Sequence, residues 1–329
     1  MALLAFLLEC AATAALVGTA TSLLLWPALP FLRGRALQRV PALRADLAFM
    51  LGLLPALTSL ALVGAAVAPP LAAALGLAED HCLGHGHHIH LCFLHATQVR
   101  PVLAVLGASS LAVFLHRALG FILRGVRMRA RLSALESLGA SRPGRFPLTA
   151  VPGAPQLCHA VGILRRRILL SASMEEELTP AELRAALAHE EAHLSRRDPL
   201  VGLLLGVAGL LAAPGLSRAW FATWQAASEE ACDAQAVLAV EDGGLVASAL
   251  VRVAALQRKA SEVAGTAAAF GALALERRVR LLLEREPRGV SSGYALGLAG
   301  AMVFALGLLA LGHASFLHHA VETALHHFF

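Results

Sequence analysis

The sequence predicts a mainly α-helical membrane protein with a polar domain between its third and fourth apolar segments. Of its 329 residues, 57% are hydrophobic and only 15% are charged. The mean hydropathy is +0.68, which is typical of membrane proteins rather than of soluble domains. Four runs approach or exceed the roughly 20 apolar residues that cross a bilayer as a helix. These runs are Leu3 to Leu25, part of Leu47 to Leu77, Pro101 to Leu123, and Tyr294 to Leu311.

The four runs predict about four transmembrane helices, and the positions of the arginine residues predict how these helices are oriented. The arginines cluster after the first run, at Arg33, Arg35, Arg39 and Arg44, and after the third run, at Arg124, Arg127, Arg129 and Arg131. The segment 79–98 and the tail beyond Leu311 contain no Lys or Arg. Because basic residues favour the cytoplasmic side, we expect a multi-pass protein of the cell (inner) membrane, in contact with the lipid bilayer, with both termini outside. The first run lacks a basic leader and a small-residue cleavage site, which indicates a retained span.

The apolar runs divide the chain into three parts. Residues 1–125 are expected to form three transmembrane helices with a His-rich outer loop at 79–100. Residues 126–290 are expected to form a cytoplasmic domain with a short hydrophobic hairpin near 199–215, and residues 291–329 the last span and a His-rich tail. Most of the net charge of +5 lies at membrane boundaries, so we expect no direct nucleic-acid partner.

A helix in the polar domain is predicted by its N-terminal signals. Thr179 is a suitable N-cap, Pro180 takes the first helical position, and Glu182 follows the cap by three residues, which makes a capping box. The stretch from Leu183 to Leu194 is rich in Ala and Leu and contains no Gly or Pro. We therefore expect a continuous helix through residue 194.

This predicted helix carries the pentapeptide His189-Glu190-Glu191-Ala192-His193. Residues four apart lie on one helix face, so both imidazoles can bind one Zn²⁺ ion. Glu190 then lies beside the open coordination position, where it can take a proton from the attacking water. The pattern indicates the chemistry of a zinc peptidase. A helix with two surface histidines and a solvated acidic pair is the alternative interpretation.

A third metal ligand is predicted in the segment Ser228 to Val237, which also has a helical pattern. Glu229 and Asp233 share a face by their spacing of four. A catalytic zinc needs three protein ligands. Glu229 would complete the set, and Asp233 could orient a ligating histidine. Glu230 is the alternative ligand, and a solvated acidic helix start is the alternative to a site.

These two motifs are accompanied by two further segments, Gly162 to Leu170 and Leu178 to Leu183. With His189 to Asp198 and Glu229 to Asp233, they resemble the BlaR/MecR-type integral-membrane zinc metallopeptidases (peptidase family M56). The chain is more distantly similar to the Ste24/HtpX membrane peptidases. The detailed likeness lies between about 155 and 285, whereas the order of the apolar runs is similar over roughly residues 1 to 318.

The resemblance implies a fold, a cofactor and a set of roles. It implies a cytoplasmic α+β zincin-type (gluzincin-like) metallopeptidase domain, with His189, His193 and Glu229 as Zn²⁺ ligands. It makes Glu190 the catalytic base and Asp233 a supporting residue. The expected substrate is a protein or peptide at the cytoplasmic side, and a transcriptional repressor is the familiar substrate in the family. Only a short tail follows the last run in place of a penicillin-binding sensor domain, so direct β-lactam sensing is not expected.

The remaining segments of the polar domain give weaker signals. Residues 199–213 form an apolar run too short to span, which predicts a re-entrant or interfacial hairpin or, alternatively, a buried helix. Frequent Pro and Gly between Ser133 and Leu170 predict short strands.

Ile163 to Leu170 is the expected strand, and its arginines are expected to be solvated or lipid-facing. The resemblance implies that this strand is a sheet edge that binds substrate, and a plain structural strand is the alternative. Leu245 to Lys259 and Leu273 to Glu286 read as amphipathic helices, the latter with ordinary juxtamembrane charge.

Histidine clusters on the expected outer face suggest a different partner. The loop contains His81, His85, His87, His88, His90 and His95, and the tail contains His313, His318, His319, His326 and His327. Such enrichment favours binding of a transition metal. A metal-binding membrane sensor or transporter is therefore the alternative function. Cys82 and Cys92 could form a disulfide on that face, whereas Cys10, Cys158 and Cys232 are expected to be unpaired.

Overall fold

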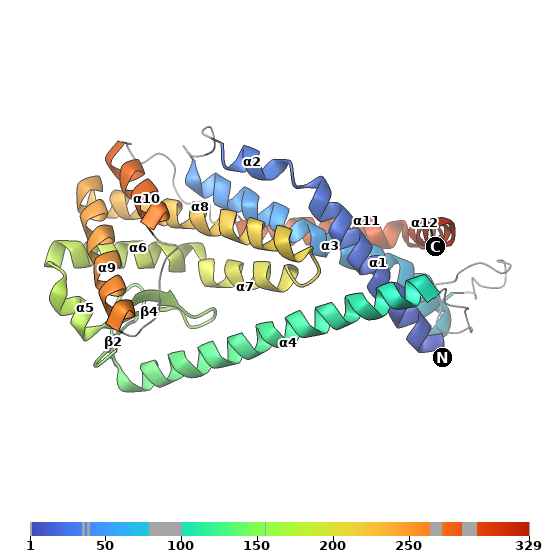
Figure 1. The fold of residues 1–329 in the computed structure, drawn as a ribbon, viewed down its shortest axis with the longest axis horizontal. Helices are drawn as coiled ribbons and strands as arrows, with labels where there is room; N and C mark the ends of the chain where they lie inside the picture. Colours follow the sequence, from blue (N-terminus) through green and yellow to red (C-terminus); the bar gives the residue numbers. More distant parts are fainter. Residues whose placement is uncertain are drawn as a thin grey trace.

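The computed structural model describes residues 2–34, 37, 40–78, 101–154, 156–263, 272–284 and 295–328. It is an elongated, mainly helical structure (Figure 1). One end of the long axis holds the sheet and the helices of the polar domain, and the other end holds the two chain termini (Figure 1). The His-rich loop, with its two expected disulfide cysteines, lies outside the described residues. Cys10, Cys158 and Cys232 are free thiols, as expected.

In the described part of the chain, three helices are long and apolar enough to cross a membrane, and they confirm the first three predicted runs. They are α1 (Ala2–Leu24), α3 (Pro41–Ala74) and α4 (Pro101–Leu138), with the short α2 (Ala28–Leu32) after α1. The 38 residues of α4 make a helix of about 57 Å, longer than the bilayer core. This helix therefore continues from the apolar region into the polar domain, where the sheet begins.

The last apolar run forms α11 (Ala295–Gly312), which is followed by α12 (Ala314–Phe328) after a bend of 78°. Only together do the two helices have the length and hydropathy of a membrane span. The tail is thus a helix packed on other helices: Val321 and Leu325 of α12 lie in one apolar cluster with Ala12 of α1 and Ala66 of α3.

Four short strands form one sheet with the order β1-β2-β4-β3. They are β1 (Ala140–Arg142), β2 (Leu148–Val151), β3 (Cys158–Val161) and β4 (Arg167–Ser171). The central pair β2 and β4 is parallel, with Leu148 opposite Ile168, and the two outer pairs are antiparallel. The expectation of short strands in this region is confirmed.

The predicted strand from Ile163 to Leu170 is wrong in its start and in its role. Gly162 has φ +91°, a conformation that glycine adopts readily, so the chain turns there and the strand begins only at Arg167. Because β4 pairs on both sides, it has no free edge. The edge strand beside the helix that carries the histidines is β3. Arg166, expected to be solvated or lipid-facing, instead donates to the Leu194 carbonyl at 2.8 Å.

The polar domain also contains helices at and on both sides of the two predicted motifs. They are α5 (Ala172–Glu177), α6 (Pro180–Arg196), α8 (Pro214–Val240), α9 (Gly243–Val263) and α10 (Ala272–Glu284). The capping box of α6 is present in both directions: Thr179 Oγ1 accepts from the Glu182 amide, and Glu182 accepts from the Thr179 amide. The two amphipathic helices expected after the second motif are confirmed as α9 and α10.

The apolar run 199–213 folds as the helix α7 (Asp198–Ala208) and a tight turn. Arg197 has φ 59° and separates α6 from α7. The chain then reverses at 209–213, and α8 lies alongside α7 (Figure 1). Val201 and Leu205 of α7 pack with Phe49 of α3 and with Trp220 and Trp224 of α8 in one core cluster. The turn brings α8 back to α6, and both ligand motifs therefore lie at the same end of the molecule.

Arg117 of α4 holds the tip of this hairpin. Its guanidinium donates to the carbonyls of Gly209, Leu210 and Ala212, at 2.5, 3.2 and 2.9 Å. The last carbonyls of a helix have no partner within the helix and form its negative dipole end. In α7, amides of the turn donate to the carbonyls of Leu205, Val207 and Ala208. The guanidinium satisfies carbonyls of the turn itself and offsets the negative end of the helix dipole, which fixes the hairpin tip to α4.

We expect Arg117→Leu to lower the free energy of unfolding by on the order of 2 kcal/mol, because buried carbonyls lose a charged donor. Unfolding of the purified chain in detergent, followed by tryptophan fluorescence, measures this change. Arg124→Leu, an exposed arginine two turns further along α4, is the matched control. Equal stability of the two variants would contradict the role given to Arg117.

Candidate metal centre

Helices α6 and α8 bring three possible metal ligands together. His189 and His193 lie one turn apart on α6, with their Nε2 atoms 3.2 Å from each other. Glu229 of α8 faces both rings: its Oε2 lies 3.5 Å from His189 Nε2 and its Oε1 lies 3.8 Å from His193 Nε2. One ligand atom from each residue falls within 4.8 Å of the others. Two imidazole nitrogens and one carboxylate oxygen are a donor set that suits Zn²⁺.

The second nitrogen of each histidine contacts an aspartate. His189 Nδ1 lies 2.9 Å from Asp233 Oδ1, and His193 Nδ1 lies 2.8 Å from Asp198 Oδ2. Metal-binding histidines commonly donate their other ring N–H to a carboxylate, which fixes the tautomer and the ring orientation. Both rings are thus turned with Nε2 toward Glu229. Asp233 occupies the place expected for a supporting residue.

Asp198 is a site residue that sequence reasoning missed. It belongs to the segment that carries the family resemblance. Its contact with His193 depends on the break between α6 and α7 at Arg197, and no local sequence pattern predicts that break. Besides His193, its Oδ2 accepts a hydrogen bond from Ser228 Oγ at 2.5 Å and one from Cys232 Sγ at 3.5 Å. Asp198 is therefore positioned from both helices of the site.

A second group of possible metal ligands consists of His193, Asp198 and Cys232. Burial raises the pKa of the Cys232 thiol well above its usual value. Because zinc binds thiolate rather than thiol, this raised pKa disfavours Cys232 as a ligand. His193 would also have to use Nδ1, which faces Asp198. The geometry therefore favours the group that contains Glu229.

Arg278 of α10 balances the acidic side of the site. Its Nη1 lies 2.9 Å from Glu229 Oε2, and its Nε and Nη2 each lie 2.7 Å from an oxygen of Asp233. The interpretation of the basic run on α10 as ordinary juxtamembrane charge is therefore wrong for Arg278. The contacts of Arg278 with Glu229 and Asp233 join distant parts of the chain. The basic sequence around Arg278 does not reveal them, because it resembles any arginine cluster beside a membrane span.

These contacts set the charge of the candidate ligands. Burial raises the pKa of Glu229, but the hydrogen bond with His189 and the charge of Arg278 outweigh it and lower the pKa to about 2. Burial also raises the pKa of Asp233, but its hydrogen bonds with Arg278 and His189 outweigh burial, so that the pKa lies well below its usual value. Burial lowers the pKa of His189, but hydrogen bonds with Asp233 and Glu229 raise it to about 10. A metal ion at Nε2 would thus have to displace a proton.

Glu190 is linked to the edge strand. The Ala160 amide of β3 donates to Glu190 Oε2 at 2.6 Å. A small cavity of about 40 Å³ borders Glu190 and His189, with mostly apolar walls from α6, α9 and β3. The carboxylate of Glu190 therefore lies between the histidines and β3, the edge strand next to α6.

Glu230, the alternative ligand, faces away from the histidines. It pairs with Arg44 of α3 at 2.8 Å and with Arg277 of α10 at 2.9 Å. The first ion pair is almost completely buried, since the side chains of Arg44 and Glu230 are 3% and 5% exposed. The structure therefore separates the roles of the two glutamates: Glu229 faces α6 and Glu230 joins α8 to a membrane helix.

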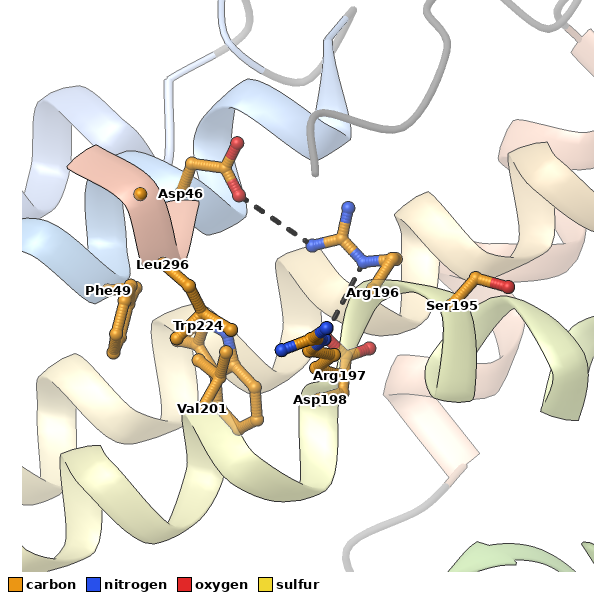
Figure 2. A pocket seen from close by; sticks show the side chains of 10 residues that line it. Asp46, Phe49, Ser195, Arg196, Arg197, Asp198, Val201, Trp224 and Leu296 are labelled. Atoms are coloured by element: carbon orange, nitrogen blue, oxygen red, sulfur yellow. Dashed lines mark ion pairs between the residues drawn. The ribbon is translucent and has the colours of Figure 1, made fainter. Parts of the chain in front are cut away.

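A larger cavity of about 420 Å³ lies behind the site, between α3, α7, α8 and α11 (Figure 2). In it, Arg196 lies between two carboxylates, with Asp46 of α3 at 3.9 Å and Asp198 at 3.5 Å (Figure 2). Because Asp198 also contacts His193, a continuous row of charged groups joins α3 to the histidine pair.

Comparison with known families bears on this region. Residues 127–282 match the family model described as BlaR1 peptidase M56. The matched region contains the end of α4, the sheet, and helices α5 to α9 with most of α10. No curated protein and no solved structure matches the chain.

The contact between Asp198 and His193 generates a prediction. Asp198→Asn should lower zinc affinity by about 10- to 100-fold, because the ring loses a charged acceptor that orients it. Competition with a fluorescent zinc chelator measures the dissociation constant. Glu191→Gln is the control, since Glu191 lies on another face of α6 and should leave the affinity unchanged. Tight zinc binding by Asp198→Asn would remove the supporting role.

Proposed function

Because the chain belongs, over residues 127–282, to the M56 family of BlaR1-type peptidases, we propose that it is a membrane-embedded, zinc-dependent endopeptidase. Family membership supports a membrane-associated peptidase, and peptidases of this family are generally metalloproteases. The observation that carries the zinc proposal is the group formed by His189, His193 and Glu229, whose ligand atoms lie within 4.8 Å of one another. We assign these three side chains as ligands and Asp233 as a supporting residue.

The proposed chemistry is hydrolysis of a peptide bond. Zinc, when bound, supplies a Lewis acid that acidifies water and polarises a carbonyl. Glu190 takes the proton from the attacking water at its carboxylate and later gives it to the leaving nitrogen. The water oxygen bonds to the carbonyl carbon, the C–N bond breaks, and the products are a carboxylate and an amine. Asp198 and Asp233 hold the two imidazoles in place throughout.

The proposed substrate binds as an added strand on β3. A free strand edge presents backbone donors and acceptors to an extended peptide. The hydrogen bond from the Ala160 amide to Glu190 places this edge next to the proposed base. A peptide paired with β3 would therefore lie across the histidines. The substrate is a cytoplasmic or membrane-proximal protein, and a transcriptional repressor is the candidate in signal transduction that the family resemblance suggests.

The proposal includes a topology. Helices α1, α3 and α4 are three of the four spans, and α11, which has the length and hydropathy of a span only together with α12, forms the fourth. Residues 126–290 form a zincin-type domain on the cytoplasmic side. The arginines after the first and third spans support this orientation, because they favour the cytoplasmic side. The N- and C-termini would then lie outside.

The alternative function, a metal-binding sensor or transporter, has narrower support. A transporter needs a row of ionisable groups along its spans. Glu9 packs at the end that holds α12, whereas His116 lies beside the hairpin tip, and the two do not form such a row. The tail does place two histidines and a glutamate together, which favours metal binding on the outer face in addition to the peptidase rather than instead of it.

The role of Glu190 predicts a separation of binding from catalysis. Glu190→Gln should retain zinc but lose at least about 100-fold in cleavage rate, because the base is gone and the ligands remain. The test measures bound zinc and hydrolysis of fluorescently quenched casein by the purified chain. Glu191→Gln should behave as wild type. Equal cleavage by Glu190→Gln and wild type would contradict the proposed base.

Metal removal gives an independent prediction. Dialysis against dipicolinate should abolish casein cleavage, since the three ligands alone cannot activate water. Addition of Zn²⁺ should restore cleavage, whereas Ca²⁺ should not, because it prefers a larger set of oxygen ligands. Full activity after zinc removal would exclude a metallopeptidase.

A further inference from the structure

A buried histidine lies at the end of the molecule opposite α6 (Figure 1). His318 of α12 is fully buried, and its Nδ1 lies 2.6 Å from the Ala66 carbonyl of α3. A carbonyl can only accept, so Nδ1 carries the proton and donates it. In the neutral ring, Nε2 then carries the lone pair. This is the arrangement of a metal-binding histidine whose other nitrogen is held by the backbone.

The Nε2 atom faces a carboxylate. It lies 3.0 Å from Glu322 Oε1, one turn along α12. His319 Nδ1 lies 3.9 Å from Glu322 Oε2, and its side chain is 50% exposed. One ligand atom from each of His318, His319 and Glu322 falls within 4.8 Å of the others. The group therefore has two nitrogen donors and one oxygen donor, with an exposed ligand through which an ion could enter.

A fourth residue places a second carboxyl group near Glu322. Glu9 of α1 is fully buried, and neither of its carboxylate oxygens has a hydrogen-bond partner among the described residues. It lies within electrostatic range of Glu322. The next residue, Cys10, packs against the apolar cluster that contains Val321 of α12. Two buried carboxylates near each other are costly unless cations compensate them.

We propose that His318, His319 and Glu322 bind a divalent transition-metal ion of the zinc class, with Glu9 as the second compensating carboxylate. Imidazole and carboxylate donors suit such ions. Two ionised carboxylates and neutral histidines balance the two positive charges of the ion. An ion at this place would tie α12 to α1 and α3. The inference is independent of the proposed peptidase site, which lies at the other end of the molecule.

Metal stoichiometry of the full chain in lipid nanodiscs tests the proposal. The parent protein carries Asn in place of the loop histidines, which otherwise compete for metal: His81, His85, His87, His88, His90 and His95. After loading with Zn²⁺ and removal of weakly bound metal, it should hold two equivalents. His318→Ala and Glu322→Gln should each hold one, and Glu9→Gln should bind the second equivalent at least tenfold more weakly. His327→Ala, an exposed histidine on the same helix, should still hold two.

The controls distinguish the two sites and the competing explanation. His193→Ala in the same parent should lose the other equivalent, so failure of either site is visible separately. In the contrary outcome, the parent binds a single equivalent that only His193→Ala removes. That result would overturn the outer site and leave His318 and Glu322 as an ion pair. Retention of two equivalents by His318→Ala and Glu322→Gln would overturn it as well. If those variants fail to fold, X-ray absorption of the parent loaded with its second equivalent decides: nitrogen and oxygen ligands support the site, and sulfur ligands refute it.

Discussion

The return of α8 to α6 is the constraint on which the rest of the site depends. It places Glu229 and Asp233 against two imidazoles that come from another part of the chain. The carboxylates of Glu229, Asp233 and Asp198 lie close together in a largely buried space. Their mutual repulsion and loss of hydration would destabilise the fold unless positive charges lay beside them. Arg278 and the histidines provide these charges on the α8 side, and Arg196 provides one beside Asp198. The fold thus brings carboxylates and imidazoles together and balances their charge with two arginines.

The same charged groups join the polar domain to the membrane helices. Asp46 and Arg44 both lie on α3, two residues apart, and they reach the site by different routes. Asp46 reaches His193 through Arg196 and Asp198, and Arg44 holds Glu230 next to Glu229. A shift of α3 would therefore change the surroundings of a histidine and a glutamate of the site together. This connection gives a physical route by which a movement of α3 could alter the candidate metal centre.

Local signals predicted the elements, and contacts between distant segments decided their roles. The capping box at Thr179 and the spacing of His189 and His193 depend only on neighbouring residues, so the helix α6 and its shared face could be read from the sequence. The apolar lengths of α1, α3 and α4 were equally readable. The strand from Ile163 was misplaced because the turn at Gly162 interrupts a run that is apolar and basic throughout. Arg278 and Arg117 could not be assigned, since their partners lie at least 45 residues away.

The central claim is that one ion is shared by α6 and α8. Anomalous diffraction at the zinc absorption edge, from crystals of the purified chain, locates that ion directly. The account predicts a peak in contact with Nε2 of His189, Nε2 of His193 and the carboxylate of Glu229. A peak bound instead by Cys232 and Asp198, or no peak between the two helices, would contradict it.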